Sequence, residues 1–210
     1  MTSPRFPLVA VYADESCLGN GREGSNPGGA GGLIELVHRG ALVRRDFWLS
    51  EPATTNNRMA LRSAIEALRI LSARGNRLRV VFFSDSKYLV EGNREWIYGW
   101  ISRGWKRRGG PVENEALWRE LAERRDGHLV DWRWVRGHAG QPQNEYANLL
   151  ATRAAAEQSR SNGAVPSRFD EWLSAQRAKG RMALEPFPLP EDASFRPSRP
   201  LPPVTHDSLF

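Results

Sequence analysis

Alternating apolar and polar positions predict strands in the first fifty residues. Leu8–Ala13 alternates apolar residues with few charges, which is typical of a strand. The glycine-rich stretch Gly19–Gly32 predicts a loop that passes into the next strand. Leu33–Val37 and Ala41–Leu49 then predict a hairpin about the turn His38-Arg39-Gly40. We therefore expect three strands before the first helix.

A helix and a buried strand are expected next. Thr54-Thr55-Asn56-Asn57 supplies short polar side chains, which accept hydrogen bonds from the first free amides of a helix. Apolar residues recur at helical spacing from Met59 to Leu71, and Arg74-Gly75-Asn76 ends the helix. The apolar run Leu78–Phe83 predicts a strand that is buried on both faces.

The rest of the domain alternates helices with one more strand. We expect a strand at Leu129–Arg136 and helices at Ser86–Glu91, Trp96–Ile101, Glu113–Arg124 and Asn144–Glu157. Three strands followed by this alternation predict an α/β domain, in which a mixed sheet carries helices on its faces.

The composition changes beyond Gln158. Eight of the 14 prolines lie from Pro166 onward, which disfavours a continuous fold there. One helix is expected at Arg168–Lys179, docked either on the domain or on a partner, with an apolar side formed by Phe169, Trp172 and Leu173. We therefore divide the chain into a domain at residues 1–157 and a proline-rich tail at residues 158–210.

Composition narrows the class of protein. With 210 residues and 40% hydrophobic residues, the chain suits one domain with a large core plus a tail. No stretch approaches the roughly 18 apolar residues of a membrane span, and the N-terminus lacks the apolar centre of a signal peptide. The single cysteine, Cys17, excludes an internal disulfide and a multi-cysteine zinc site. We expect a cytoplasmic protein.

The charge balance favours a polyanionic partner. The formal net charge is +6 and the sequence pI is about 10.1. Basic contacts with phosphates release condensed counterions and so favour nucleic-acid binding. Basicity that serves only solubility is the alternative, and the placement of the charges matters more than their sum.

Five short blocks occur in an order and with a spacing that carry a resemblance to a known family. They are Tyr12–Asn20, Thr54–Met59, Ser84–Tyr88, Trp96–Lys106, and Val135–Gly140 followed by Asn144-Glu145. Together they resemble bacterial ribonuclease H of type 1, over about Leu8–Ala156. The resemblance implies the ribonuclease H-like fold, a five-stranded mixed sheet flanked by helices. This fold agrees with the element pattern above.

The resemblance also implies a reaction. Members of the family cleave the RNA strand of RNA–DNA hybrids with two divalent metals held by carboxylates, leaving a 3′-hydroxyl and a 5′-phosphate. One metal makes water a nucleophile near neutral pH, and the other stabilises charge on the leaving oxygen. Carboxylates suit Mg²⁺, with Mn²⁺ as the alternative. We expect no small-molecule cofactor, no membrane partner and a monomeric chain.

Three residues match the family's catalytic positions. Asp14 ends the first strand, Asp85 ends the strand at Leu78–Phe83, and the resemblance makes both metal ligands. The alternative for Asp85 is capping of the helix that follows. His138 lies in the glycine-flanked loop Gly137–Gly140, and the resemblance gives it a role in proton transfer or product release. A loop histidine without a role is the alternative.

Two other catalytic positions depart from the family pattern. Ala60 stands where the first helix usually has glutamate, and Asn148 stands where the last helix usually has aspartate. Alanine offers no ligand, whereas an asparagine oxygen can contact a metal without supplying charge. Since two unit charges 4 Å apart interact by about 4 kcal/mol at an effective dielectric near 20, metal binding should weaken markedly.

Glu15 is the candidate replacement, because it follows Asp14 where the family commonly has glycine. Neighbouring side chains of a strand point to opposite faces, which argues against shared ligation. We hypothesise that alternation fails beside the loop and that Glu15 enters the space left by Ala60. The alternative is a solvated surface glutamate. Glu66 is a poorer candidate, at about 9 Å of axial rise from Ala60.

The resemblance also implies a surface for the hybrid, whose 2′-hydroxyls are read in the minor groove. The residues matching these contacts are Cys17, Asn20, Asn56, Asn57 and Lys87. Helix capping is the alternative for the two neighbouring asparagines, and burial is the alternative for Cys17. A basic protrusion with Trp105, Lys106, Arg107 and Arg108 should meet DNA-strand phosphates through its charges, whereas packing should be the main role of its tryptophans.

Three hypotheses about function follow. The leading one is a metal-dependent endoribonuclease with Asp14 and Asp85 as metal anchors, Glu15 or Asn148 filling in, and His138 assisting. The second is a catalytically impaired or inactive module that binds RNA–DNA hybrids. In the third, Ala60 and Asn148 were introduced to trap substrate. Binding residues do not discriminate the first two hypotheses, since both need them.

Overall fold

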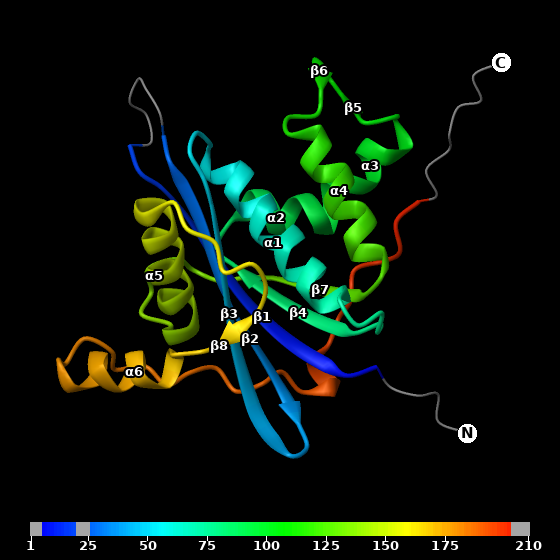
Figure 1. Ribbon diagram of the computed structural model, residues 1–210. Coiled ribbons are helices and arrows are strands. Elements are labelled where there is room, and N and C mark those ends of the chain that lie inside the picture. Colours follow the sequence, from blue (N-terminus) through cyan, green and yellow to red (C-terminus); the bar gives the residue numbers. More distant parts are fainter. Residues whose placement is uncertain (1–5, 20–25, 203–210) are drawn as a thin grey trace, which may run out of the picture.

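A six-stranded mixed sheet with helices on both faces forms the centre of the molecule (Figure 1). The computed structural model describes residues 6–19 and 26–202. The strand order is β7-β4-β1-β2-β3-β8. The predicted α/β fold with a mixed sheet is therefore confirmed.

The strands form an antiparallel and a parallel half. β1 (Leu8–Cys17), β2 (Gly28–His38) and β3 (Ala41–Glu51) pair antiparallel in succession, whereas β4 (Arg79–Ser84) and β7 (Leu129–Trp134) extend the sheet parallel to β1. The sixth strand, β8 (Val165–Pro166), pairs with β3 where five strands were expected. A two-residue strand beyond the family resemblance carries no periodic pattern that sequence reasoning could detect.

Helices cover the two faces of the sheet unequally. One face carries α1 (Asn56–Ser72), α2 (Lys87–Glu91), the π-helical η1 (Gly92–Trp96), α3 (Ile97–Ser102) and α4 (Glu115–Asp126). The other carries α5 (Pro142–Glu157) and α6 (Phe169–Ala178), and η2 (Asp192–Ser194) lies further along the tail. A hairpin of β5 (Lys106–Arg107) and β6 (Gly110–Pro111) follows α3. The two short helices expected at 86–101 are joined through η1.

The glycines at the start of β2 serve close packing. The expected loop through Gly32 is wrong in its last part, because β2 begins at Gly28. A Cβ at Gly29 would lie 2.2 Å from the Ala151 carbonyl oxygen, and one at Gly31 would lie 2.5 Å from the Ala151 nitrogen. α5 therefore rests directly on the backbone of this strand, and only glycine permits that approach.

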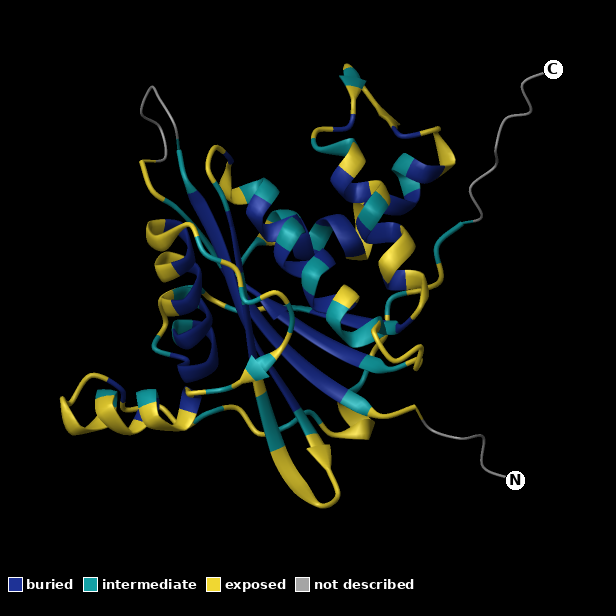
Figure 2. Cartoon of the chain, in the orientation of Figure 1, coloured by how far each residue is buried: buried dark blue, intermediate teal, exposed yellow. Residues whose placement is uncertain are grey.

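Two hydrophobic clusters cover the two faces of the sheet. Figure 2 shows that the central parts of the strands are buried. The larger cluster packs β1, β2 and β4 against α1, α3 and α4. The second packs Tyr12 and Phe83 against α5, and the tail completes it with Phe169, Leu173 and Met182. α6 thus docks on the domain, one of the two places that the sequence left open.

The tail continues across the sheet after α6. The backbone of Phe187 contacts Gln143 in α5, and the backbone amide of Ser198 donates to the Val130 carbonyl in β7. Arg199 then lies with its guanidinium 3.9 Å from the centroid of the Tyr98 ring. The tail therefore reaches from the β3 edge to the β7 edge, and the domain boundary at residue 157 stays a prediction.

Within the described part of the chain, we find no helix of the length and apolar character that crossing a bilayer requires.

Candidate active site

Three carboxylates gather where the central parallel strands end. Asp14 and Glu15 lie near the end of β1, and Asp85 follows β4 directly. Each offers an oxygen, and these oxygens all lie within 4.8 Å of one another. Asp14 is only 4% exposed, whereas the other two are partly buried.

Strand register explains why these residues meet. β1 and β4 are parallel, and their pairing ends with Tyr12 opposite Phe83. The carboxyl ends of parallel neighbours lie at the same edge of a sheet, so residues just beyond that pair converge. β1 continues past its last partner in β4, which leaves its edge at Asp14 and Glu15 open toward Asp85.

Glu15 reaches the cluster without any break in the strand. The expected failure of alternation is wrong, because β1 stays regular through Cys17. Asp14 faces α5, where the Asn144 side chain donates to it, and Glu15 lies opposite Ala30, which packs against Met59 of α1. The two carboxylates therefore approach from opposite faces and meet at the open edge of the strand.

The surroundings of Glu15 differ from those of a surface glutamate. Its Oε2 atom is buried and has no hydrogen-bond partner. Ala13, its neighbour on the same face, shares a core cluster with the fully buried Ala60. Glu15 thus occupies the face on which the first helix lacks a carboxylate, and the alternative of a solvated side chain disagrees with this burial.

Burial raises the pKa of every carboxyl in the cluster, and repulsion within the cluster raises it further for Asp14 and Glu15. The pKa of Asp14 is raised to about 7 by burial first and by Asp85 next. Burial followed by the charges of Asp14 and Asp85 raises the pKa of Glu15 well above its usual range, and burial raises that of Asp85. A divalent cation would relieve this repulsion and give the unpartnered Glu15 oxygen a ligand role. The residues present therefore fit the metal that the family implies.

The first turn of α5 supplies groups that the sequence reasoning did not single out. The Asn144 side chain donates to Asp14 Oδ2 at 3.2 Å, while its own Oδ1 is buried without a partner. Glu145 accepts a hydrogen bond from the Gly140 amide at 3.2 Å and raises the pKa of both aspartates. The match of Asn144-Glu145 to the family block was the one signal that could have found them.

His138 and Asn148 lie together beside the carboxylates. His138 is exposed, with a left-handed φ of 51°, and its charge lowers the pKa of Asp85. Asn148 Nδ2 lies 3.4 Å from His138 Nδ1, and Asn148 Oδ1 accepts from Thr152. Asn148 is one helical turn beyond Asn144, so both asparagines share a face of α5. A metal-ligand role for Asn148 stays a prediction.

The Asp85 carboxylate packs directly against Gly137, and we expect Gly137→Ala to reduce cleavage activity. An added Cβ would lie 2.1 Å from Asp85 Oδ2, so the carboxylate must move. Since a misplacement near 1 Å can cost about 10²-fold, we expect kcat to fall by about 10- to 100-fold. Steady-state kinetics would measure this fall. Gly127→Ala is the matched control, because its Cβ would have 3.5 Å of clearance. Equal kinetics of both variants would contradict the expectation.

The residues expected at the minor groove are distributed around this edge. Cys17 is partly buried against Ala30, Leu49 and Met59, which supports the alternative of a packing role. The cap of α1 is Thr55, whose hydroxyl accepts from the Arg58 amide, so neither Asn56 nor Asn57 makes the expected cap. Asn56 is exposed, Asn57 is partly buried, and Asn20 lies outside the described residues.

Lys87 lies next to the carboxylates. Its ammonium group is 5.3 Å from the centroid of the Trp134 ring, and Trp134 Nε1 donates to the Asp85 backbone carbonyl at 3.0 Å. Trp134 is 45% exposed. The pair places a cation and an aromatic surface beside Asp85, and Trp134 is a residue that the sequence reasoning missed.

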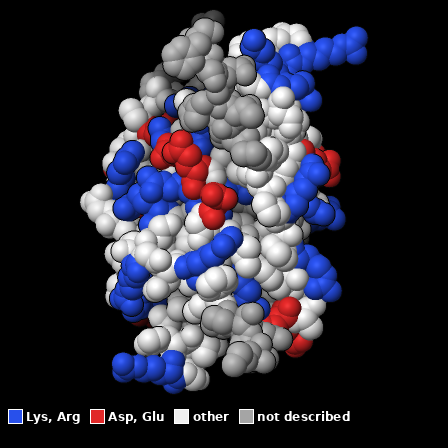
Figure 3. Space-filling model, turned by 90° about the vertical axis from the view of Figure 1, so that its right-hand side faces the viewer, with Lys and Arg blue, Asp and Glu red and all other residues white. Residues whose placement is uncertain are grey.

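The basic residues after α3 lie on the β5–β6 hairpin. Lys106, Arg107 and Arg108 are exposed, whereas Trp105 is 3% exposed and has the Arg119 guanidinium 4.8 Å from its ring centroid. The burial of Trp105 agrees with a packing role. Figure 3 shows Lys and Arg side chains distributed over most of one face of the molecule, with acidic side chains in fewer patches.

The mixed sheet and the carboxylates at the ends of its central parallel strands agree with the class of nucleases that have the ribonuclease H-like fold. Residues 7–156 match the family described as RNase H. The chain is 44% identical to a ribonuclease H of Stutzerimonas stutzeri over 153 residues, which cover 72% of this chain and 94% of the relative. It is 45% identical to a ribonuclease HI of Caulobacter vibrioides over 147 residues, which cover 69% and 91%. The chain therefore belongs to the ribonuclease H family and is a hydrolytic nuclease.

A solved structure resembles the chain over nearly its whole length. It is the crystal structure of LC9-RNase H1, a type 1 RNase H with the type 2 active-site motif. The identity is 57%, the TM-score is 0.88, and 99% of each chain is covered. The similarity thus extends beyond the family match and includes the tail.

Proposed function

We propose that the chain is an endoribonuclease that cleaves the RNA strand of RNA–DNA hybrids by metal-assisted hydrolysis, leaving a 3′-hydroxyl and a 5′-phosphate. Asp14, Glu15 and Asp85 hold the metal, which is Mg²⁺ or alternatively Mn²⁺. The observation that carries the proposal is the convergence of these three carboxylates within 4.8 Å. Hard oxygen ligands of this kind suit both ions.

Glu15 supplies the charge that Ala60 lacks. Its buried, unpartnered Oε2 faces the same side of the sheet as α1, where related enzymes carry their glutamate. The structural relative LC9-RNase H1 supports a changed ligand set, since it is a type 1 enzyme with the type 2 active-site motif and is 57% identical to this chain. Asn148 lies further out beside His138 and contributes at most a neutral oxygen.

Each residue has a role that its position permits. When bound, divalent cations lower the pKa of water and stabilise negative charge at the scissile phosphate. The Asn144 side-chain amide donates to Asp14 Oδ2 and so holds the Asp14 carboxylate in one orientation. His138 lies on an exposed loop beside Asp85, where it can move a proton to or from the departing strand.

The hybrid lies across the edge that carries the carboxylates. Asn56 and Asn57 present amides, and Cys17 a backbone group, to the minor groove, where 2′-hydroxyls distinguish RNA from DNA. Lys87 beside Trp134 contacts a phosphate close to Asp85. The exposed basic residues of the β5–β6 hairpin meet the phosphates of the DNA strand.

Removing the hairpin charges is expected to weaken the salt dependence of binding. The triple variant Lys106→Ala, Arg107→Ala, Arg108→Ala loses three exposed cations. Each phosphate contact adds about 0.9 to the slope of log K against log salt, so the slope should fall by up to about 3. Fluorescence anisotropy with a labelled hybrid in Ca²⁺ measures it. Arg39→Ala, which changes the exposed turn between β2 and β3, is the control, and equal slopes for triple variant and parent would remove the hairpin assignment.

The cleavage assay tests the function directly. The full chain is incubated with a hybrid whose RNA strand carries a 5′ label, in Mg²⁺ or Mn²⁺, beside duplex RNA and duplex DNA. We expect internal cleavage of the hybrid RNA alone, abolished by EDTA, with products that a 3′-hydroxyl-dependent polymerase extends. A hybrid that stays intact with both ions would sink the proposal and favour the binding module.

A hybrid-binding module without chemistry is the second candidate. That hypothesis arose because Ala60 and Asn148 replace two carboxylates that are typical of the family. The carboxylate cluster argues against it, because binding alone does not require three mutually repelling groups with raised pKa values. Magnesium as the resident metal, a monomeric state and a cytoplasmic location remain parts of the proposal.

A further inference from the structure

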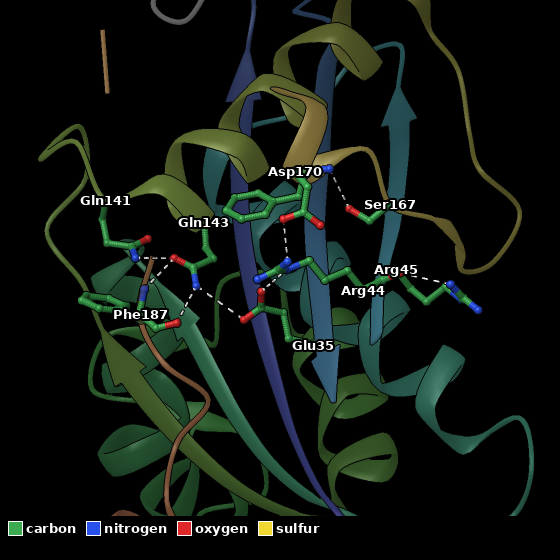
Figure 4. Close-up of polar contacts among 9 residues, drawn as sticks. Glu35, Arg44, Arg45, Gln141, Gln143, Ser167, Asp170 and Phe187 are labelled. Atoms are coloured by element: carbon green, nitrogen blue, oxygen red, sulfur yellow. Dashed lines mark hydrogen bonds and ion pairs between the residues drawn. The ribbon is translucent and has the colours of Figure 1, made fainter. Parts of the chain in front are cut away.

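The tail docks on the first turn of α5 through the backbone of one residue. The Phe187 amide donates to Gln143 Oε1 at 3.0 Å, and Gln143 Nε2 donates to the Phe187 carbonyl at 2.9 Å (Figure 4). Gln143 is completely buried. The Gln143 side-chain amide thus pairs the N–H and C=O groups of Phe187, as the backbone of a neighbouring strand would do in a sheet.

The sequence prepares Phe187 for this contact. Pro186 and Pro188 flank it, and neither has a backbone amide hydrogen. A residue before proline is restricted to extended conformations, so the Phe187 backbone loses little further freedom when it docks. Its ring lies 6.0 Å, between centroids, from that of Phe83 in the second core cluster.

Hydrogen bonds connect Gln143 with Asp14. Gln141 Nε2 donates to Gln143 Oε1, and Gln141 Oε1 accepts from the Asn144 backbone amide at 3.0 Å. The Asn144 side chain then donates to Asp14 Oδ2 at 3.2 Å. The chain of contacts therefore runs from the tail, through the start of α5, to the most buried carboxylate of the site.

Two further contacts hold the tail against the same region. Gln143 Nε2 also approaches the buried Glu35 carboxylate at 3.4 Å, and Arg44 bridges Glu35 to Asp170 of α6 with contacts of 2.6 Å to each (Figure 4). Further along the tail, a Cβ at Gly140 would lie 3.7 Å from the Leu184 side chain. The tail thus borders both α5 and the loop that carries His138.

We propose that Gln143 is a positioning residue for hydrolysis and that the tail backbone at Phe187 fixes it. Gln143 and Gln141 together hold the start of α5, so that Asn144 keeps Asp14 oriented toward the other carboxylates. The inference rests on the proposed function. It assigns the tail a role at the active site, although the tail lies outside the motif blocks and outside residues 7–156, which match the family.

The test compares Gln143→Met with the parent and with Glu171→Gln. Methionine keeps the length of the side chain but loses all four hydrogen bonds described above, whereas Glu171→Gln weakens an exposed ion pair with Arg168 within the tail. Groups behind metal ligands typically change affinity or activity by about 10- to 100-fold. We expect kcat to fall about tenfold and the Mg²⁺ concentration for half-maximal activity to rise. The KM for the hybrid should stay within about twofold, and the control should resemble the parent.

A second pair of variants isolates the backbone contact. Phe187→Pro removes the amide hydrogen and the ring, while Phe187→Ala removes the ring alone. The proline variant should move kcat and the Mg²⁺ requirement in the same direction as Gln143→Met, and the alanine variant should not. Because this segment is part of the tail and proline suits an extended backbone, both chains should fold even if Gln143→Met does not.

Hydrogen exchange supplies a readout that is independent of turnover. We expect the Asn144 amide to exchange faster in Gln143→Met and Phe187→Pro, without metal present, because its acceptor Gln141 is released. A lower melting temperature with unchanged kcat, Mg²⁺ requirement and Asn144 exchange would overturn the inference. A parent that cleaves no hybrid would instead contradict the proposed function. Exchange of the Asn144 amide would still test whether the contact between Gln143 and Phe187 stabilises the start of α5.

Discussion

Replacement of Asp14 by asparagine is expected to reduce hybrid cleavage by about 10³-fold or more. Asp14 is the most buried of the three carboxylates, and its two oxygens accept from the Glu15 amide and the Asn144 side chain. The amide keeps the shape but removes one charge from the cation site. A loss of about 4 kcal/mol in stabilisation of the reacting charges corresponds to roughly 10³-fold in rate.

The same variant should be more stable than the parent when no metal is present. The pKa of Asp14 is raised from 3.8 to about 7, so the folded state binds a proton more tightly than the unfolded state does. The free energy of unfolding therefore falls as the pH rises from about 4 to about 7, and the penalty persists above that range. Asparagine carries no charge, so we expect roughly 2–4 kcal/mol more stability at pH 8.

Thermal unfolding with EDTA and with Mg²⁺ measures this effect. The parent should gain melting temperature from Mg²⁺, and Asp14→Asn should gain little. Asp126→Asn, an exposed change at the end of α4, is the control for both readouts. A metal-free variant that melts below the parent, or one that keeps more than a tenth of the activity, would contradict the role given to Asp14.

Motif spacing predicted which residues would be near one another, but the strand register was needed to bring Glu15 into the site. The blocks around Asp14 and Asp85 are local, and each aspartate follows an apolar run whose strand is aligned with the other by parallel pairing. For Glu15, period-two alternation argued against a shared site. Glu15 reaches the site because β1 extends beyond its partner β4. This difference in length cannot be recognised from the sequence of either strand alone.

The tail shows a different limit of sequence reasoning. Its prolines disfavour regular structure, and this composition was taken to disfavour a continuous fold. Yet prolines also restrict the unfolded chain, so short extended segments can dock with a small loss of entropy. Phe169 completes a core cluster, and the Phe187 backbone forms hydrogen bonds with the Gln143 side chain. Neither contact produces a hydrophobic periodicity that could be recognised in the sequence.

Loss of the Glu15 carboxylate is expected to reduce activity strongly, and a glutamate at position 60, where the family usually has one, is expected to restore much of it. We expect Glu15→Gln to lower kcat by about 10²-fold or more, because it removes a charge beside the cation. Glu66→Gln is the control and should resemble the parent, since the described contacts of Glu66 are with Arg69 on the exposed side of α1.

The relocation is the double variant Glu15→Gly, Ala60→Glu, compared with Glu15→Gly alone. Ala60 is fully buried on the face of α1 that packs against β1, so a glutamate there enters the space that the Glu15 side chain leaves when glycine replaces it. We expect the single variant to be as impaired as Glu15→Gln and the double variant to regain at least about tenfold, because one charge returns to the same cations. Mg²⁺-dependent cleavage by folded protein measures both. Unchanged activity in Glu15→Gln would exclude Glu15 from the site, and a folded double variant without recovery would show that the two positions are not equivalent.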